Sequence, residues 1–321
     1  MRRLRLWEAL AFGNALVVGV LLALRVGFPV GASLRAHGPM LLVQTGLLAA
    51  GTAFRALGLA VSGRAGQAGR ARLFLSRMAR PGNLLDLARL LVALALVAWA
   101  YSWLKVFVPR LNGWITDPLL AVLDFKLHFG INPNRFLIEL FPSPAFWRFL
   151  DVYYGQFVLT MGLAFAWFGS ALSARERARF ASGFALLWIT GAWLYVAAPS
   201  LGPCYVFPDD YAAVRPEMPL QTETQHLLLA QYHAVTKGGE ASRRGLSAVF
   251  GIGAMPSLHV AGQAFVAFFA RRRQPRLSFL FGLCTVLTFA GSLISGWHYA
   301  VDGYAGILLA WGAWKLGERM G

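Results

Sequence analysis

Long apolar stretches are the feature of this sequence that most constrains its fold. A helix needs about 20 mostly apolar residues to cross the hydrocarbon core of a bilayer. Of all residues, 57% are hydrophobic and only 14% are charged, whereas a soluble domain carries nearer a quarter charged residues. The sequence therefore predicts an all-α, polytopic membrane helical bundle of about eight transmembrane helices. The expected spans cover residues 8–27, 39–61, 84–107, 152–172, 181–198, 255–270, 277–294 and 299–315.

Arginine and lysine gather in the segments between or beyond these spans, and this distribution predicts the orientation of the chain. With eight spans, all the basic segments fall on one side of the membrane, and short cytoplasmic loops are where Lys and Arg accumulate. We therefore expect both termini to lie in the cytoplasm. If the cell is bacterial, the protein should lie in the inner membrane. The basic segments should contact anionic lipid head groups. This distribution explains the net charge of +16 without a nucleic-acid partner. The basic segments are residues 2–5, 64–80, 175–179, 271–276 and 315–319.

The spans divide into an N-terminal pair and a larger C-terminal group, which we expect to form a single integrated membrane domain. Residues 1–82 hold the first two spans and a basic cytoplasmic loop, and residues 83–321 hold the other six spans. Two segments on the side opposite the basic loops, residues 110–150 and 199–253, are longer than ordinary connections. Segments of this length usually carry structure or function of their own.

The first outer segment predicts an interfacial amphipathic helix that starts near Asp117-Pro118 and ends before the Pro-Ser-Pro sequence at 142–144. We expect Asp117 and Asp124 to serve as a cap and as part of a solvated face, rather than as acid–base groups. The second outer segment begins with turn-rich sequence and continues as a polar helix around 223–234.

Two histidines and an aspartate lie near the ends of the last three predicted spans, and these are the candidate catalytic residues. Ionisable groups at membrane boundaries are functional suspects, because lipid does not solvate them. His298 and Asp302 are four residues apart, a spacing that puts both on one face of a helix. A carboxylate in contact with an imidazole fixes its tautomer. His259 follows Pro256-Ser257, which is typical of a helix start, where free backbone N–H groups attract anions.

At these residues the chain resembles the type 2 phosphatidic acid phosphatase superfamily. Pro256-Ser257-Leu258-His259 is similar to the second signature of this family, and His298-Tyr299-Ala300-Val301-Asp302 is similar to the end of the third. The form of these motifs looks closest to the branch that includes fungal inositol phosphorylceramide synthase. The resemblance covers about the last two-thirds of the chain and implies a six-helix core there. Gly291-Ser292 stands where the third signature has Ser-Arg, so that arginine is missing here.

The three candidate residues have distinct roles in phosphoryl transfer, which needs a nucleophile and an acid for the leaving group. His298 can supply the nucleophile, and Asp302 can orient it and stabilise the imidazolium. His259 can protonate the departing alkoxide. The resemblance implies the same roles, with a phosphohistidine intermediate at His298 and with no metal and no cofactor.

The cations that bind the phosphate are harder to place, because the first signature of the family has no clean copy in this chain. Lys237 and Arg244 have the spacing of that signature, although Gly245 replaces its proline. Phosphate chemistry needs cations near the phosphoryl oxygens, and few others lie on this side of the membrane. We therefore predict that Lys237, Arg243 and Arg244 bind the phosphate, together with Ser257 at the helix start.

These observations predict an integral-membrane lipid phosphotransferase or phosphatase that acts on phospholipid-type phosphate esters at the extracytoplasmic face. A membrane phospholipid would be the donor, and the acceptor would be water or the hydroxyl of ceramide or a similar lipid. A hydrolytic lipid phosphate phosphatase or polyprenyl diphosphate phosphatase is the alternative. A non-enzymatic lipid-binding membrane protein is a second alternative, from another class.

Overall fold

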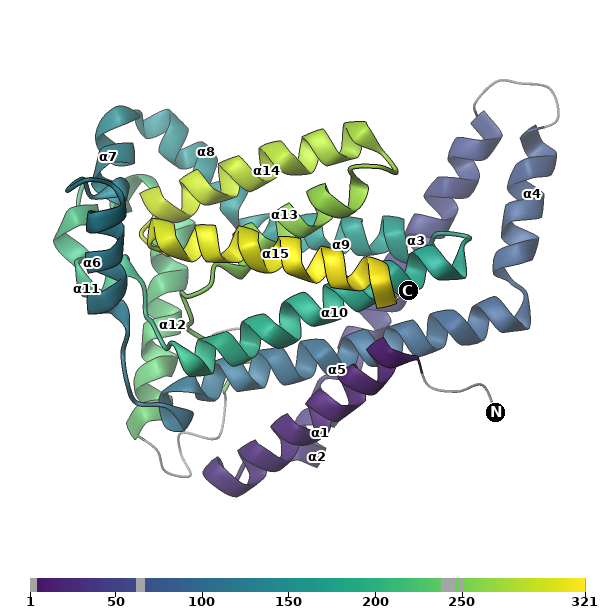
Figure 1. Cartoon of the computed structure of the whole chain (residues 1–321), viewed down its shortest axis with the longest axis horizontal. Helices are drawn as coiled ribbons and strands as arrows, with labels where there is room; N and C mark the ends of the chain where they lie inside the picture. The colour runs from purple at the N-terminus through teal and green to yellow at the C-terminus, as the bar shows by residue number, and fades with distance from the viewer. Residues whose placement is uncertain (1–4, 62–66, 238–245, 249–250, 321) are drawn as a thin grey trace.

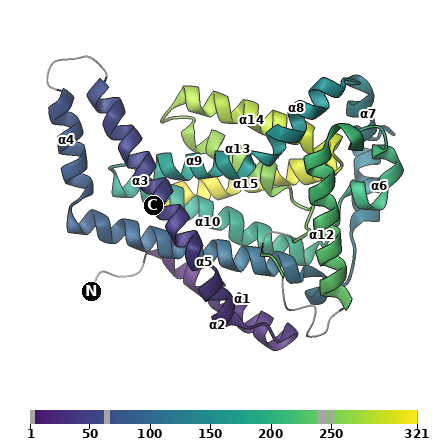
Figure 2. The same ribbon diagram turned by 180° about the vertical axis from the view of Figure 1, so that it is seen from behind.

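The computed structural model describes residues 5–61, 67–237, 246–248 and 251–320, and its regular elements are all helical. Most helices lie side by side in a bundle, and the helices of residues 117–140 and 203–237 gather at one end (Figures 1 and 2). The helices of the bundle are α1 (Leu6–Val26), α3 (Gly38–Val61), α5 (Pro81–Leu111), α8 (Pro144–Gly155), α9 (Phe157–Gly169), α10 (Ala174–Ala197), α13 (Leu258–Ala270), α14 (Pro275–Ile294) and α15 (Ala300–Met320). The others are α2 (Val30–Ala36), α4 (Gln67–Met78), α6 (Asp117–Leu127), α7 (Pro133–Leu140), α11 (Pro203–Val206), η1 (Pro208–Tyr211), η2 (Arg215–Glu217) and α12 (Pro219–Lys237).

A helix stands at each of the eight positions where the sequence predicts a membrane span. Five helical units in the described residues are long and apolar enough to cross a membrane: α1, α2 with α3, α5, α10 and α14. The pair α8 and α9, bent by 46°, makes a sixth if it is one span. α13 has only 13 residues, because the residues just before Leu258 form a non-helical segment, and α15 carries Asp302 in its first turn. Length and composition thus support five or six membrane crossings. α13 and α15 are not among these, and they pack with the crossing helices in the bundle.

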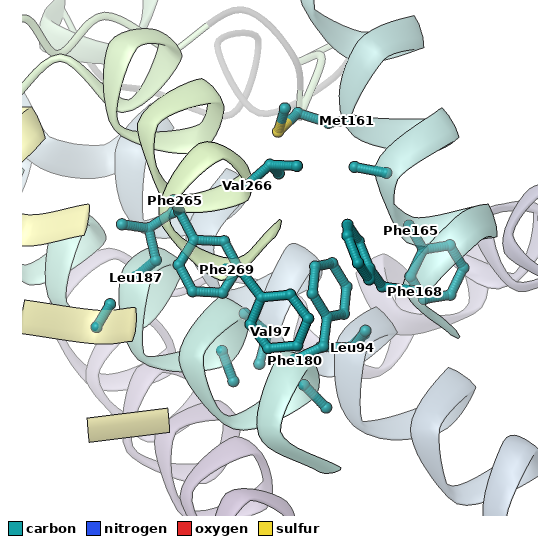
Figure 3. Close-up of a cluster of buried hydrophobic side chains, with 14 of the residues drawn as sticks. Leu94, Val97, Met161, Phe165, Phe168, Phe180, Leu187, Phe265, Val266 and Phe269 are labelled. Atoms are coloured by element: carbon teal, nitrogen blue, oxygen red, sulfur yellow. The ribbon is translucent and has the colours of Figure 1, made fainter. Parts of the chain in front are cut away.

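One apolar core joins helices from both halves of the chain. Aromatic side chains of α9, α10 and α13 meet at its centre (Figure 3), where Phe168 and Phe180 contact Phe269 at ring-centroid distances of 4.9 and 5.3 Å. The same cluster includes buried residues of α5 and α15, such as Leu94 and Ala313. α5 is therefore packed into the same core as the C-terminal helices that carry the candidate site.

The N-terminal helices also join this bundle through specific polar contacts. Trp193 Nε1 on α10 donates to Asn14 Oδ1 on α1 at 2.8 Å, and Trp99 Nε1 on α5 donates to Ser33 Oγ on α2 at 3.1 Å. The guanidinium of Arg55 on α3 lies over the Trp167 ring of α9, 3.9 Å from its centroid. Residues before 83 are thus attached to the remaining helices by packing as well as by sequence.

Ion pairs bring the arginine-rich segments together at one end of the bundle. Asp86 of α5 pairs with Arg5 at 3.0 Å and with Arg177 of α10 at 3.7 Å. Glu318 of α15 pairs with Arg273, which follows α13, at 2.7 Å. The start of α1, the end of α15 and α4 lie at this end, while α6, α7, α11 and α12 lie at the other (Figure 1). The described parts of the basic segments therefore share one end of the bundle, and the compartment that this end faces stays a prediction.

The opposite end carries the two predicted outer segments. In the first, α6 begins at Asp117 directly after Thr116, and α8 begins at Pro144 with Ser143 as its N-cap. The predicted helix start and the predicted break at 142–144 are thus confirmed, although α6 and α7 together occupy the place of one expected helix. In the second segment, α12 contains the predicted polar helix.

Asp117 and Asp124 are buried, which corrects the prediction that they belong to a solvated face. Their exposed fractions are 0% and 3%. The Asp124 carboxylate accepts the backbone N–H groups of the first two residues of α15, at 2.7 and 2.8 Å. The Asp117 carboxylate accepts the N–H groups of Leu201 and Gly202, at 2.8 Å each. The physical reason is that the start of α15 leaves free N–H groups, and this start and the residues just before α11 both lie inside the protein.

Candidate active site

His298 and Asp302 lie where α14 turns into α15. Gly296 turns the chain with a φ of 77°, and α15 begins two residues after His298. His298 Nδ1 lies 3.4 Å from Asp302 Oδ2, and the backbone N–H of Tyr299 donates to the same oxygen at 2.9 Å. Only 4% of His298 and 0% of Asp302 are exposed. The predicted contact is therefore present and buried, but His298 precedes α15, so the two residues do not share a helix face as the sequence predicted.

The backbone of His298 is held from two directions. Its N–H donates to the carbonyl of Ser292 at 3.3 Å, and its carbonyl accepts from Asn134 Nδ2 of α7 at 3.0 Å. The same Asn134 nitrogen also donates to the Leu293 carbonyl at 2.9 Å. Sequence reasoning missed Asn134, because an asparagine in the first turn of a short helix gives no sign of a partner 164 residues away.

Ser257 is the N-cap of α13 and joins this helix to α15, so the helix starts just after Pro256 rather than including it. Ser257 Oγ accepts the Val260 N–H at 3.4 Å, and the Ser257 N–H donates to the Asp302 carbonyl at 2.9 Å. Gly306 of α15 lies so close that a Cβ at this position would be 2.4 Å from the Ser257 carbonyl oxygen. α13 and α15 thus touch at Ser257, which brings the two sequence signatures together.

His259, the second residue of α13, faces His298. The centroids of their rings are 6.3 Å apart, and the ring planes are inclined by 55°. The two imidazoles are therefore neighbours, although they come from different sequence signatures.

Two aromatic side chains hold the His259 ring from the other side. Tyr154 stacks on it at a centroid distance of 4.9 Å and 25°, and Phe157 contacts it at 4.3 Å and 52°. Tyr154 belongs to α8 and Phe157 begins α9, so the bend between these two helices sets both rings against one imidazole. The position of the His259 ring is therefore determined by three helices rather than by α13 alone.

Of the three predicted phosphate-binding cations, the structure describes only Lys237. Lys237 is the last residue of α12 and is exposed. Arg243 and Arg244 lie outside the described residues. Instead, Lys105 of α5 is close enough to act electrostatically on the His259 ring. Sequence reasoning missed Lys105, although a lysine inside an apolar span is a signal that could have found it.

Comparison with known proteins assigns the chain to a family. Residues 119–316, more than half of the chain, match the family model of the PAP2 superfamily. The chain therefore belongs to the PAP2 superfamily, and this membership indicates a phosphatase-type membrane enzyme. The matched segment runs from α6 into α15 and includes His259, His298 and Asp302, while α1–α5 lie before it. No curated protein and no solved structure matches the chain.

Proposed function

We propose that the protein is a lipid phosphotransferase or phosphatase in which His298 accepts a phosphoryl group at the extracytoplasmic face. The observation that carries this proposal is an asymmetry between the two facing histidines. A buried carboxylate contacts His298, whereas aromatic rings surround His259. Superfamily membership supports phosphoryl chemistry. The asymmetry supports different roles for the two histidines, with His298 as the nucleophile and His259 as the acid.

In the first step, the lone pair of His298 Nε2 attacks phosphorus, a P–N bond forms, and the bond from phosphorus to the donor alkoxide breaks. A proton on Nδ1 directed at Asp302 leaves Nε2 free to attack. The Asp302 carboxylate then stabilises the positive charge that develops on the ring. His259 enters as the imidazolium and gives its proton to the departing alkoxide, which leaves as an alcohol.

In the second step, the acceptor hydroxyl passes its proton to the neutral His259 and its oxygen attacks phosphorus. The P–N bond breaks, and its electron pair returns to His298 Nε2. Both histidines are then in their starting states. The same geometry serves both steps, because His259 alternates between acid and base on one side of the phosphoryl group.

For the acceptor we propose a lipid hydroxyl such as that of ceramide, so that a phosphorylated head group passes from one lipid to another. The burial of His298 and Asp302 supports transfer, because a site closed to bulk water protects a reactive intermediate from hydrolysis. The resemblance of the Gly253–His259 sequence to the synthase branch also favours it. Hydrolysis of a lipid phosphate or a polyprenyl diphosphate is the alternative reaction, with water as the acceptor.

The test uses detergent-purified protein and phosphatidylinositol labelled with phosphorus-32, with and without ceramide. Transfer predicts a labelled ceramide-based lipid that appears only when ceramide is added. Hydrolysis predicts a labelled water-soluble phosphate in both samples. His298→Ala should abolish either product, while His226→Ala, an exposed histidine on α12, should behave as wild type. Failure of the wild-type protein to release or transfer phosphate from phosphatidylinositol, phosphatidic acid or a polyprenyl diphosphate would overturn the proposal.

A further inference from the structure

A bound phosphoryl group carries oxygens whose negative charge needs a cation or strong donors nearby. The arginine-rich segments lie at the far end of the bundle from α6, α7 and α12. Within the described residues, the groups that act electrostatically on His259 are Lys105 and His298. Lys105 is therefore the cation to consider at this site.

Two tyrosines hold Lys105 in the interior of the bundle. Its ammonium lies 5.9 Å from the ring centroid of Tyr101, one turn earlier on α5, and 5.4 Å from that of Tyr195 on α10. The rings of Tyr101 and Tyr195 are themselves neighbours, with their centroids 6.3 Å apart. The lysine side chain therefore lies along the aromatic faces of two helices, where cation–π attraction fixes its direction.

The same tyrosines connect Lys105 to the start of α13. On α10, a Cβ at Gly191, one turn before Tyr195, would lie 2.5 Å from Leu258 Cδ2, so the residue before His259 packs on this part of α10. A Cβ on Gly251 would lie 2.9 Å from Lys105 Cγ, and a Cβ on Gly253 would lie 2.9 Å from the Tyr195 ring. The segment that leads into α13 thus packs directly on Lys105 and Tyr195, and two glycines permit this close approach.

Lys105 has no ion-pair partner among the residues that the structure describes. Within the same residues, the carboxylates of Asp86 and Glu318 pair with arginines at the basic end, and those of Asp117 and Asp124 accept backbone N–H groups. A partly buried ammonium without a counter-charge is unfavourable by itself. It becomes favourable when an anion binds beside it.

Tyr154 supplies a second donor at the same place. Its hydroxyl is buried and has no hydrogen-bond partner, although buried polar groups are normally paired. Its ring stacks on His259, and its hydroxyl interacts electrostatically with Tyr101 and Asp302. Tyr154 therefore offers an unpaired buried donor from a ring that stacks on His259.

We propose that the Lys105 ammonium and the Tyr154 hydroxyl bind the non-bridging oxygens of the phosphoryl group between His259 and His298. This inference rests on the proposed function for the identity of the ligand as a phosphate ester. It assigns the cation to α5, which lies before the segment that matches the superfamily. The N-terminal helices would then complete the site, in place of the first-signature cations that the sequence lacks.

The test measures binding of inorganic phosphate and orthovanadate to the detergent-purified full chain by titration calorimetry. Lys105→Met should weaken vanadate binding by about 10- to 100-fold, the loss expected for a charge-assisted hydrogen bond. Lys105→Arg should retain most of the affinity. Tyr154→Phe should weaken binding by about 2- to 10-fold, as for a neutral hydrogen bond. Lys126→Met, an exposed lysine on α6, is the matched control and should bind as wild type.

A second measurement uses the wild-type protein, so it does not depend on whether the variants fold. Acetylation of lysines by acetic anhydride, followed by peptide mass spectrometry, should show that vanadate protects Lys105 and leaves Lys126 unprotected. Equal modification of Lys105 with and without vanadate, or wild-type affinity in Lys105→Met, would overturn the inference.

The two proposals fail in different ways. If vanadate binds through Lys105 but no covalent adduct forms on His298, the proposed function fails and the inference stands. If the His298 adduct forms normally while Lys105→Met keeps wild-type vanadate affinity, the inference fails and the proposed function stands.

Discussion

Glu318 at the basic end and the buried aspartates at the site end have opposite kinds of partner. Glu318 pairs with arginine side chains, with Arg273 at 2.7 Å and with Arg179 at 3.5 Å. The buried aspartates accept backbone N–H groups: Asp124 from the start of α15, and Asp151 from the start of α12 at 3.1 and 2.8 Å. The first arrangement balances charge, and the second fixes where a helix begins.

This difference indicates which charged side chains can be substituted with little loss of stability. A partly exposed ion pair contributes little, since water and salt screen it. A buried carboxylate that holds two N–H groups leaves both unpaired when it is removed. Because α15 begins two residues after His298, Asp124 determines the position of the histidine without touching it. We therefore expect the site end to be sensitive to single substitutions and the basic end to tolerate them.

The largest expected effect is at the two facing histidines. His298→Ala should abolish turnover and covalent labelling, because it removes the attacking nitrogen. Asp302→Asn keeps the shape but loses the charge that stabilises the imidazolium, so it should resemble His298→Ala. His259→Ala should slow transfer by about 10²–10⁴-fold, the usual contribution of a general acid, and should lose less with a nitrophenyl ester.

The measurement for this prediction is rapid-quench labelling with a phosphorus-32 donor. An acid-labile, base-stable adduct is expected in wild type and in His259→Ala, and not in His298→Ala. The reverse pattern would exchange the roles of the two histidines. Transfer without an adduct in any variant would favour direct in-line displacement.

The two ends of the bundle are expected to face opposite sides of the membrane, so a thiol reagent outside the cell should label a cysteine at one end and not at the other. Single cysteines replacing Ala230 on α12 and Arg272 after α13, both exposed, can be probed with an impermeant thiol reagent in intact cells. Cys204 and Cys284 are free thiols and should first be changed to serine. Labelling at position 230 alone is expected. Labelling at position 272 alone would reverse the orientation and put the site in the cytoplasm.

An intermediate effect is expected at Asp124. Burial raises the pKa of its carboxyl, while the two N–H groups from α15 oppose this shift. Asp124→Asn replaces one acceptor oxygen by a donor, so one N–H of α15 loses its partner. We expect a loss of about 1–3 kcal/mol of stability and slower turnover, with the His298 adduct still formed. Thermal unfolding and single-turnover rates measure the two effects, and wild-type values for both would refute the positioning role.

Much of the fold was accessible from the sequence because the signals are local. Runs of apolar residues located the eight helices, and Pro-Ser-Pro at 142–144 located the start of α8. The spacing of His298 and Asp302 predicted that they are neighbours, although the turn that joins them begins before α15 rather than within it. Pro256-Ser257 predicted the start of α13 for a similarly local reason.

The remaining parts of the site depend on contacts between distant segments, which local patterns do not encode. Asp124 meets α15 across 176 residues, so its sequence neighbours indicated a solvated helix face. The expected span at 255–270 gave a shorter helix, because Gly251 and Gly253 let the segment before Leu258 pack in a non-helical form against α5 and α10. That packing brings Lys105 to the site, which no spacing within one helix could have predicted.

A small effect is expected at the basic end. Glu318→Gln removes the charge that Arg273 and Arg179 share. Both partners are partly exposed, with side-chain exposures of 21% and 26%, so the loss of stability should be below about 1 kcal/mol. Turnover should be unchanged. A loss of activity comparable to that of Asp124→Asn would contradict the contrast between the two ends.

The smallest effect is expected from chelation of divalent cations. Magnesium and calcium sites are built from carboxylate and carbonyl oxygens that converge on one point. Near His298, the oxygens of Asp117 and Asp124 accept backbone N–H groups, and Asp302 Oδ2 accepts from Tyr299. The described residues contain no group of three His, Cys, Asp or Glu side chains able to hold a metal ion. Since Lys105 can neutralise the phosphoryl oxygens instead, EDTA should leave transfer unchanged. Loss of activity in EDTA, restored by one divalent ion, would mean that the carboxylates of the site end exchange their N–H partners for a metal.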